Sequence, residues 1–177
     1  VEDIEKTWRD VAEKVGVEAE ELKEKVIPLS ALYSVGEHTR SALVAISDSA
    51  LPSNVGGGYN LRVIMRRAMD FIQKYKWDLS MEDVAEWHAD YLKPLFPELN
   101  ENIESVRKII RVEQKRFMET KEKSRHIVKR IIERNEDLNE NKMVELYTSH
   151  GISPEMIFEE AQKIGKRINI PEDFYSK

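Results

Sequence analysis

The chain of 177 residues contains no cysteine, which excludes disulfide bonds, thiolate metal sites and cysteine nucleophiles. Its four histidines, His38, His88, His126 and His150, are too widely spaced to supply two metal ligands one helical turn apart. No apolar run approaches the roughly eighteen residues that a membrane span requires, and the acidic N-terminal segment is unlike a basic signal peptide. We therefore expect a cytoplasmic chain with no metal site and no membrane partner.

Enzyme motifs are also missing. The chain has neither a phosphate-binding loop of the Gly-x4-Gly-Lys-Ser/Thr type nor a Gly-x-Ser-x-Gly turn. It has no internal repeat, no low-complexity tract and no convincing strand pattern. We therefore expect this chain to contain no catalytic residue, no active site and no bound cofactor.

Apolar residues recur with helical spacing instead. They predict a first helix over 4–15 that Gly16 ends, a short acidic segment that stops at Pro28, and a longer helix over 32–50. Ser80, followed three residues later by Asp83, resembles a capping arrangement at the start of another helix. The N-terminal half of the chain is therefore expected to be helical.

The segment 101–135 contains neither proline nor glycine and predicts one helix about 50 Å long. Its apolar seam includes Glu113, Thr120 and Ser124, and we expect these polar groups to have partners elsewhere in the fold. We interpret Glu113 and Thr120 as buried polar residues that fix the register of the helix.

The predicted fold class is all-α, with a single helical region over 1–177. It comprises several helices, the long helix near 101–135, two last helices over 139–150 and 153–164, and a short extended C-terminal tail. Pro94 and Pro97 mark a possible sub-boundary near 93–101.

Residues 51–58, Leu-Pro-Ser-Asn-Val-Gly-Gly-Gly, predict a loop, and the helical period resumes at Tyr59. The glycines could place backbone N–H groups at the positive end of the following helix, which suits a phosphate. Taken alone, such a loop is more often a structural turn, and Asn54 more simply a helix cap or a turn former.

Basic residues are concentrated in two segments of an acidic chain whose net charge is -5. Residues 54–76 carry five basic and one acidic side chain, and residues 104–134 carry eleven basic and five acidic side chains. On one face of the fold, these segments would form a positive field able to collect phosphates. The alternative is a solvated surface with ordinary ion pairs.

Four elements, in order, resemble alanyl-tRNA synthetases in the region just beyond the catalytic domain. The loop from Leu51 to Arg62, followed by Arg66-Arg67-Ala68, resembles their signature, and its triple glycine resembles the archaeal variant. The other three are Glu37-His-Thr-Arg40 with Ala45-Ile-Ser-Asp48; Glu113, Phe117 and Thr120; and Leu146 to Gly151 with Pro154-Glu155.

The resemblance implies an all-α domain that binds the acceptor stem of alanine tRNA and recognises its G·U wobble pair. The family uses an Asn and an Asp for the base pair. Asn54 matches the first, whereas Thr148 stands where the family has Asp, so that either Thr148 reads the pair more weakly or Glu145 takes over. The tRNA backbone is assigned to three glycines and three arginines: Gly56, Gly57, Gly58, Arg62, Arg66 and Arg67.

The resemblance also implies which partners this chain has. Besides the tRNA acceptor stem, they are the catalytic and editing domains of the same polypeptide, which lie outside these residues. ATP, magnesium and zinc would belong to those domains of the parent ligase. Two other interpretations stay open, namely a structural or interdomain helical scaffold and a double-stranded RNA binder without sequence preference.

Overall fold

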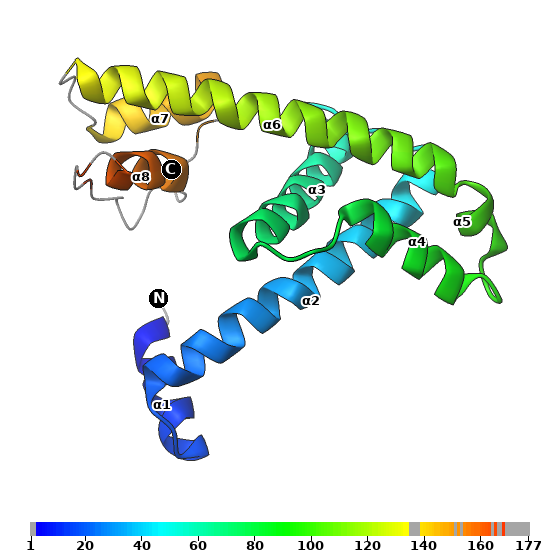
Figure 1. Ribbon diagram of the computed structural model, residues 1–177, viewed down its shortest axis with the longest axis horizontal. Coiled ribbons are helices and arrows are strands. Elements are labelled where there is room, and N and C mark those ends of the chain that lie inside the picture. The colour runs from blue at the N-terminus through cyan, green and yellow to red at the C-terminus, as the bar shows by residue number, and fades with distance from the viewer. Residues whose placement is uncertain are drawn as a thin grey trace. The chain divides into compact units, whose positions relative to one another are not determined.

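The computed structural model describes residues 3–134, 139–150, 152, 154–163, 165 and 168. These residues form eight α-helices and no strand, so the predicted all-α class is confirmed (Figure 1). None of the described helices is long and apolar enough to cross a membrane. The helices are α1 Ile4–Val15, α2 Ala19–Ser47, α3 Gly56–Tyr75, α4 Met81–Leu92, α5 Pro97–Glu101, α6 Ile103–Glu133, α7 Glu140–His150 and α8 Pro154–Lys163.

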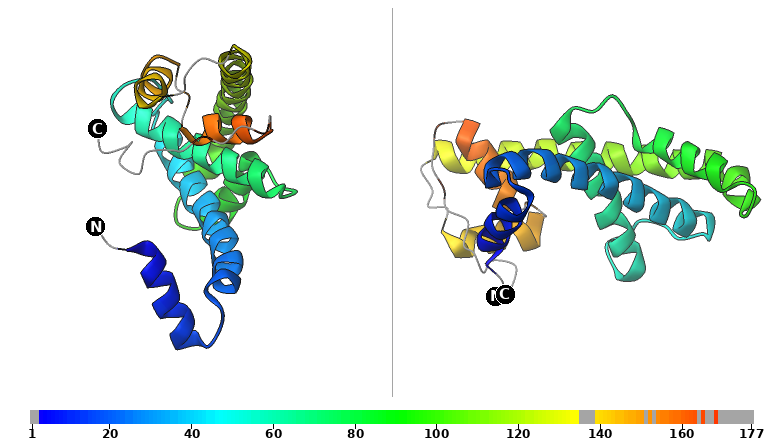
Figure 2. Two further views of the ribbon diagram at one scale, coloured as in Figure 1. Left: turned by 90° about the vertical axis from the view of Figure 1, so that its left-hand side faces the viewer. Right: turned by 90° about the horizontal axis from the view of Figure 1, so that it is seen from below.

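The chain divides into two compact units, Val1–Gln114 and Lys115–Lys177, so that α6 contributes residues to both. The possible sub-boundary near 93–101 stays a prediction. Within the first unit, α2 packs against α3 and α4, while α1 contacts the beginning of α2, away from α3 and α4 (Figures 1 and 2). The buried side chains of this unit include Val35, Leu43, Met65, Val106 and Ile110.

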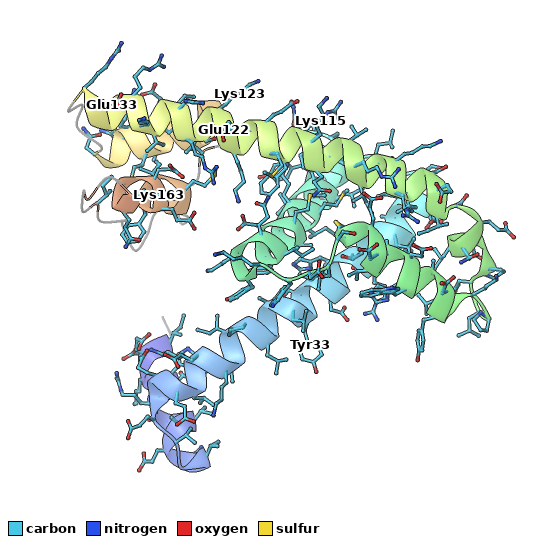
Figure 3. The ribbon with its side chains drawn as sticks, in the orientation of Figure 1. Tyr33, Lys115, Glu122, Lys123, Glu133 and Lys163 are labelled. Atoms are coloured by element: carbon cyan, nitrogen blue, oxygen red, sulfur yellow. The ribbon has the colours of Figure 1, made fainter. Side chains whose placement is uncertain are left out.

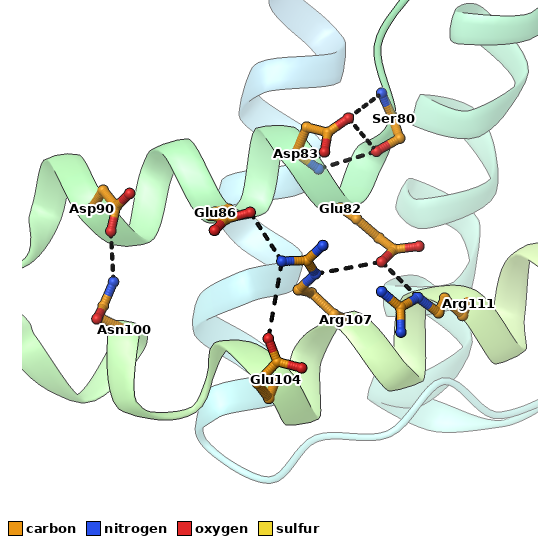
Figure 4. A network of polar contacts seen from close by, with 9 residues as sticks. All are labelled: Ser80, Glu82, Asp83, Glu86, Asp90, Asn100, Glu104, Arg107 and Arg111. Carbon is orange, nitrogen blue, oxygen red and sulfur yellow. Dashed lines mark hydrogen bonds and ion pairs between the residues drawn. The ribbon is translucent and has the colours of Figure 1, made fainter.

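Local capping contacts explain where several helices begin and end. Asp3 accepts a hydrogen bond from the backbone N–H of Lys6 at the start of α1, and Gly16 ends that helix with a left-handed φ of 77°. Ser80 and Asp83 form the capping box expected at the start of α4 (Figure 4). These contacts lie within a few residues of each other, which is why the sequence predicts them.

The prediction that a segment stops at Pro28 is wrong, because α2 runs through this residue as one helix of 29 residues. A proline inside a helix removes one hydrogen bond to the carbonyl four residues earlier, here that of Glu24. Glu24 is exposed, so water can satisfy its carbonyl oxygen. This part of α2 also leaves apolar side chains exposed, among them Tyr33 (Figure 3).

The prediction that helix resumes only at Tyr59 is also wrong. α3 begins at Gly56, so the three glycines form its first turn instead of a loop. The backbone N–H groups of a first helical turn have no partner within the helix. Placing glycines in this turn therefore affects few intrahelical hydrogen bonds. The loop proper is therefore confined to residues before Gly56.

The seam of α6 is only partly as expected. Glu113 is 1% exposed and has partners on α3, as predicted. Thr120 is half-buried, and its hydroxyl donates to the carbonyl of Arg116 in the same helix; Ser124 is buried but likewise donates to Thr120. For these two residues the predicted partners elsewhere in the fold are replaced by carbonyls one turn earlier, a common solution for short hydroxyl side chains.

The second unit has its own apolar core, formed by the C-terminal part of α6 with α7 and α8. Arg125 of α6 also forms an ion pair with Glu160 of α8, with Nε 3.2 Å from Oε1. The two last helices are confirmed, although Ser153, Ile164 and all of the predicted tail except Ile168 lie outside the described residues. The core residues are Val128, Ile131, Met143, Leu146, Ile152, Ile157 and Ala161.

Candidate nucleic-acid interface

The loop at residues 51–55 lies directly against the first turn of α3. The backbone N–H of Ser53 donates to the carbonyl of Gly58 at 3.0 Å, and the Ser53 hydroxyl donates to the carbonyl of Val55 at 2.9 Å. A Cβ atom added to Gly58 would lie 2.3 Å from Ser53 Oγ and 2.6 Å from the carbonyl oxygen of Leu51. Only glycine permits this close approach, so Gly58 fixes the position of the loop.

Gly56 and Gly57 are exposed, and the residue that precedes α3, Val55, supplies no side-chain hydrogen bond to the helix start. The beginning of α3 therefore carries the partial positive charge of a helix N-terminus with no side-chain cap at that position. Gly56 also has a φ of 57°, a conformation that other residues adopt only at a cost. Of the two simpler interpretations of Asn54, the helix cap is wrong, since Val55 occupies that position, whereas the position of Asn54 in the loop before α3 is compatible with a turn former.

Asn54 is exposed, and its amide is oriented by α3. The carbonyl oxygen Oδ1 of Asn54 accepts a hydrogen bond from Nη1 of Arg62, while Nη2 of the same arginine donates to the carbonyl of Pro52 at 3.4 Å. A guanidinium group is only a donor, so the amide must turn its oxygen towards Arg62 and its NH2 group away. The Asn54 amide nitrogen has no partner within residues 3–134.

Arg62 and Arg66 turn towards the same buried carboxylate. Nε of Arg66 donates to Oε1 of Glu113 at 2.8 Å, and Nε of Arg62 lies 3.1 Å from that oxygen. The Arg62 N–H is not aligned for a hydrogen bond, so this second contact is an ion pair. The side chains of Arg62 and Arg66 are 14% and 27% exposed, so both arginines make their main contacts inside the domain.

Arg67, the third predicted backbone contact, is exposed and differs from the other two. Its guanidinium lies 5.6 Å from the centre of the Phe71 ring, and within the described part of the chain it has no ion pair with a carboxylate. Burial lowers the pKa of His38 below its ordinary value, and the positive charge of Arg67 lowers it further. Because Arg67 is exposed and has no carboxylate partner in the described part of the chain, it is the arginine of this group that is most available to a phosphate.

Some basic side chains of α6 are paired with carboxylates of another helix, whereas others have no acidic partner in the described part of the chain. Arg107 pairs with Glu86 at 3.0 Å, and both Arg107 and Arg111 approach Glu82, at 3.5 and 2.7 Å (Figure 4). In contrast, three exposed residues spaced seven apart have no side-chain partner among the residues that the structure describes, namely Arg116, Lys123 and Arg130. Figure 3 labels Lys123. The sequence could not separate these groups, because the acidic partners lie mostly on another helix.

Thr148 lies in α7, but its side chain is outside the described residues, as is Gly151. Glu145, its predicted substitute, is exposed and forms an ion pair with Lys142, whose Nζ lies 2.9 Å from Oε2. Asn54 belongs to the first unit and Thr148 to the second. Over the described ranges, no cluster of three His, Asp or Glu side chains could hold a metal ion.

Fold and site together define an all-α chain in which Arg62, held by a buried carboxylate, fixes a loop at the start of a basic helix. The chain matches the family of class II (A) tRNA synthetases over residues 1–177. It is 45% identical over 177 residues to the alanine–tRNA ligase of Methanocella arvoryzae, which is 100% of this chain and 20% of that protein. It is 35% identical over 175 residues to the ligase of Ignicoccus hospitalis, covering 99% and 19%.

A third relative, the alanine–tRNA ligase of Thermococcus kodakarensis, is 34% identical over 171 residues, which cover 94% of this chain and 19% of that protein. The chain belongs to the class II (A) tRNA synthetase family, as a domain of the alanyl-tRNA synthetase type. It spans about a fifth of the length of these relatives.

Proposed function

We propose that this chain binds the acceptor stem of alanine tRNA and recognises its G·U wobble pair, as part of an alanine–tRNA ligase. Family membership supports the tRNA as the ligand. The observation that carries the proposal for the site is the exposed amide of Asn54, which Arg62 fixes beside the start of α3. Catalysis, with its ATP and magnesium, and editing, with its zinc, are assigned to other domains of the ligase, which we place in the cytoplasm.

The orientation of Asn54 suggests which half of the base pair it recognises. Because its oxygen is engaged by Arg62, Asn54 offers an NH2 donor, which suits an acceptor such as the uracil oxygen in the minor groove. In A-form RNA this groove is wide and accessible. The guanine 2-amino group then needs an acceptor from elsewhere, and we assign it to the hydroxyl of Thr148 or the carboxylate of Glu145.

Phosphate contacts are assigned to the first turn of α3 and to Arg67. The backbone N–H groups of Gly56, Gly57 and Gly58 lie at the positive end of the helix. Arg62 contributes mainly by holding the loop, and Arg66 by sharing the Glu113 carboxylate with Arg62. A second group on α6 consists of Arg116, Lys123 and Arg130, whose seven-residue spacing places them about 10.5 Å apart along one side of the helix.

Binding of acceptor minihelices tests this proposal. Fluorescence anisotropy would compare minihelices with G·U and G·C at the third base pair over a range of salt concentrations. We expect tighter binding to G·U and a steep fall in affinity with salt. Binding that ignores the base pair would indicate a general double-stranded RNA binder, and no salt-dependent binding would indicate a scaffold.

Two alanine variants locate the recognition. Asn54→Ala should lower the preference for G·U by the equivalent of about 1–3 kcal/mol, the usual value of a base contact. Asn60→Ala is the matched control, because Asn60 is exposed like Asn54 but lies on α3, and its side chain has no hydrogen-bonded partner in the described residues. Equal preferences in both variants would contradict a role for Asn54.

Two further variants test the remaining assignments. Arg67→Ala should weaken both minihelices alike and reduce the slope of log affinity against log salt by about one. Thr148→Asp should increase the preference for G·U, because a carboxylate accepts more strongly than a hydroxyl. An unchanged preference in Thr148→Asp would show that position 148 does not contact the base pair.

A further inference from the structure

Two carboxylates in the first unit each lie between two arginines. Glu113 of α6 contacts Arg62 and Arg66 of α3, and Glu82 of α4 contacts Arg107 and Arg111 of α6 (Figure 4). Both carboxylates are shielded from water, with side chains that are 2% and 14% exposed. The two clusters therefore provide a natural comparison within one domain.

Only the Glu113 cluster reaches the loop. The Nε end of the Arg62 guanidinium lies against Glu113, and its Nη atoms donate to the Asn54 side chain and to the carbonyl of Pro52. No hydrogen bond or ion pair joins Glu82, Arg107 or Arg111 to residues 51–58, all of which the structure describes. A guanidinium is planar and rigid, so holding one edge fixes the direction of the other.

We infer that Glu113 is a positioning residue for base-pair recognition: its buried carboxylate holds Arg62 in the orientation that presents the NH2 group of Asn54 to the RNA. This inference rests on the proposed function of Asn54. Glu113 lies 59 positions after Asn54 in the sequence and acts only through Arg62.

The physical reason lies in the charge of Glu113. Arg62 and Arg66 place two positive groups beside one carboxylate oxygen, where water is largely excluded. Removing the negative charge leaves two like charges facing each other in a medium of low dielectric constant. Arg62 then gains by turning towards solvent, which frees the Asn54 oxygen and allows the amide to rotate. A rotating amide offers donor and acceptor alike and no longer selects one partner.

Glu113→Gln tests the inference in the full chain, because it keeps the size of the side chain and removes its charge. The ratio of G·U to G·C minihelix affinity should fall at least about fivefold, the lower limit of a 1–3 kcal/mol contact. Glu82→Gln removes the same charge from the other cluster and should leave the ratio unchanged. A fall of the same size in Glu82→Gln would overturn the inference, because it would indicate general damage to the unit.

Coupling to Asn54 distinguishes positioning from a merely structural role. In an Asn54→Ala background, Glu113→Gln should change the ratio no further, because the group it positions is already missing. Independent falls that multiply in the double variant would overturn the inference. If Glu113→Gln does not fold, Arg62→Lys serves instead, since a lysine keeps the charge but cannot bridge Glu113 and Asn54 as the planar fork does. An unchanged ratio in Arg62→Lys would be equally decisive against it.

The experiment also separates this inference from the proposal beneath it. If the wild-type chain does not distinguish G·U from G·C, the proposed function fails, and with it the assignment of Glu113 to recognition. If the wild-type chain distinguishes them and Glu113→Gln does so equally well, only the positioning role fails. The side-chain amide signals of Asn54 in nitrogen-15 NMR give a readout without RNA, and they should shift in Glu113→Gln and stay unchanged in Glu82→Gln.

Discussion

Replacing Gly58 with alanine tests the close contact between the loop and α3. The new Cβ would lie 2.3 Å from Ser53 Oγ and 2.6 Å from the carbonyl oxygen of Leu51, both well inside van der Waals contact. The serine hydroxyl can rotate away, but the Leu51 oxygen belongs to the backbone, so the loop itself must move. Overpacking of this kind costs about 1–3 kcal/mol, while alanine gains about 1 kcal/mol over glycine in a helix. We expect a net destabilisation of up to about 2 kcal/mol.

The adjacent glycines supply matched controls. No heavy atom lies within 4 Å of a Cβ added to Gly56 or Gly57. Gly57→Ala should therefore stabilise the unit by about 0.5–1 kcal/mol. Gly56→Ala should destabilise it by about 1 kcal/mol, because its φ of 57° is unfavourable for alanine. The same substitution in one helical turn is thus predicted to be stabilising at Gly57, and destabilising at Gly56 and Gly58 for two different reasons.

Urea unfolding followed by tryptophan fluorescence measures these effects. All three tryptophans, Trp8, Trp77 and Trp87, lie within residues 1–114, so the signal reports on the first unit alone. A Gly58→Ala variant at least as stable as the wild type would refute the argument, since it would mean that the loop does not rest on α3. Gly58→Ala should also weaken the proposed preference for G·U, because the displaced loop carries Asn54.

Three further predictions concern the first unit. The pKa of His38 is lowered below its ordinary 6.5, so the contribution of neutral His38 to stability should be present above about pH 6.5 and be lost as the pH falls below that value. Urea titrations at several pH values would detect this loss of stability, and His38→Gln should reduce the loss. Pro28→Ala should stabilise α2 by about 1–3 kcal/mol in the same assay, and no gain would argue against a helix continuous through Pro28. Ser80→Ala should destabilise the unit by about 1 kcal/mol through loss of the capping box, whereas an unchanged denaturation midpoint would contradict that contact.

The sequence predicts those features that depend on neighbouring residues. Gly16 and the pair of Ser80 and Asp83 act within one helical turn, so their spacing alone identifies a helix end and a helix start. The long helix α6 is likewise predicted to within two residues at each end, because residues 103–133 include neither proline nor glycine.

Propensity fails where surroundings decide the backbone conformation. Pro28 is unfavourable in a helix, but it lies where the freed carbonyl of Glu24 can contact water. The three glycines favour a loop, yet they form the first turn of α3, and the approach of Leu51 explains why the third of them must be glycine. That approach joins two backbone segments and leaves no periodic pattern in the sequence.

The candidate site shows the same division between local and distant causes. The i, i+4 spacing of Arg62 and Arg66 predicts that they share a face of α3, but it cannot reveal that this face meets Glu113, which lies 47 positions after Arg66. Phosphate and carboxylate offer an arginine similar oxygens, so a pair of arginines in a sequence cannot distinguish an RNA contact from an internal one. The buried carboxylate changes the interpretation, because it makes Arg62 the support for Asn54 and leaves Arg67 as the exposed cation. The proposed recognition of the base pair then depends on an internal charge as much as on the residues assigned to face the RNA.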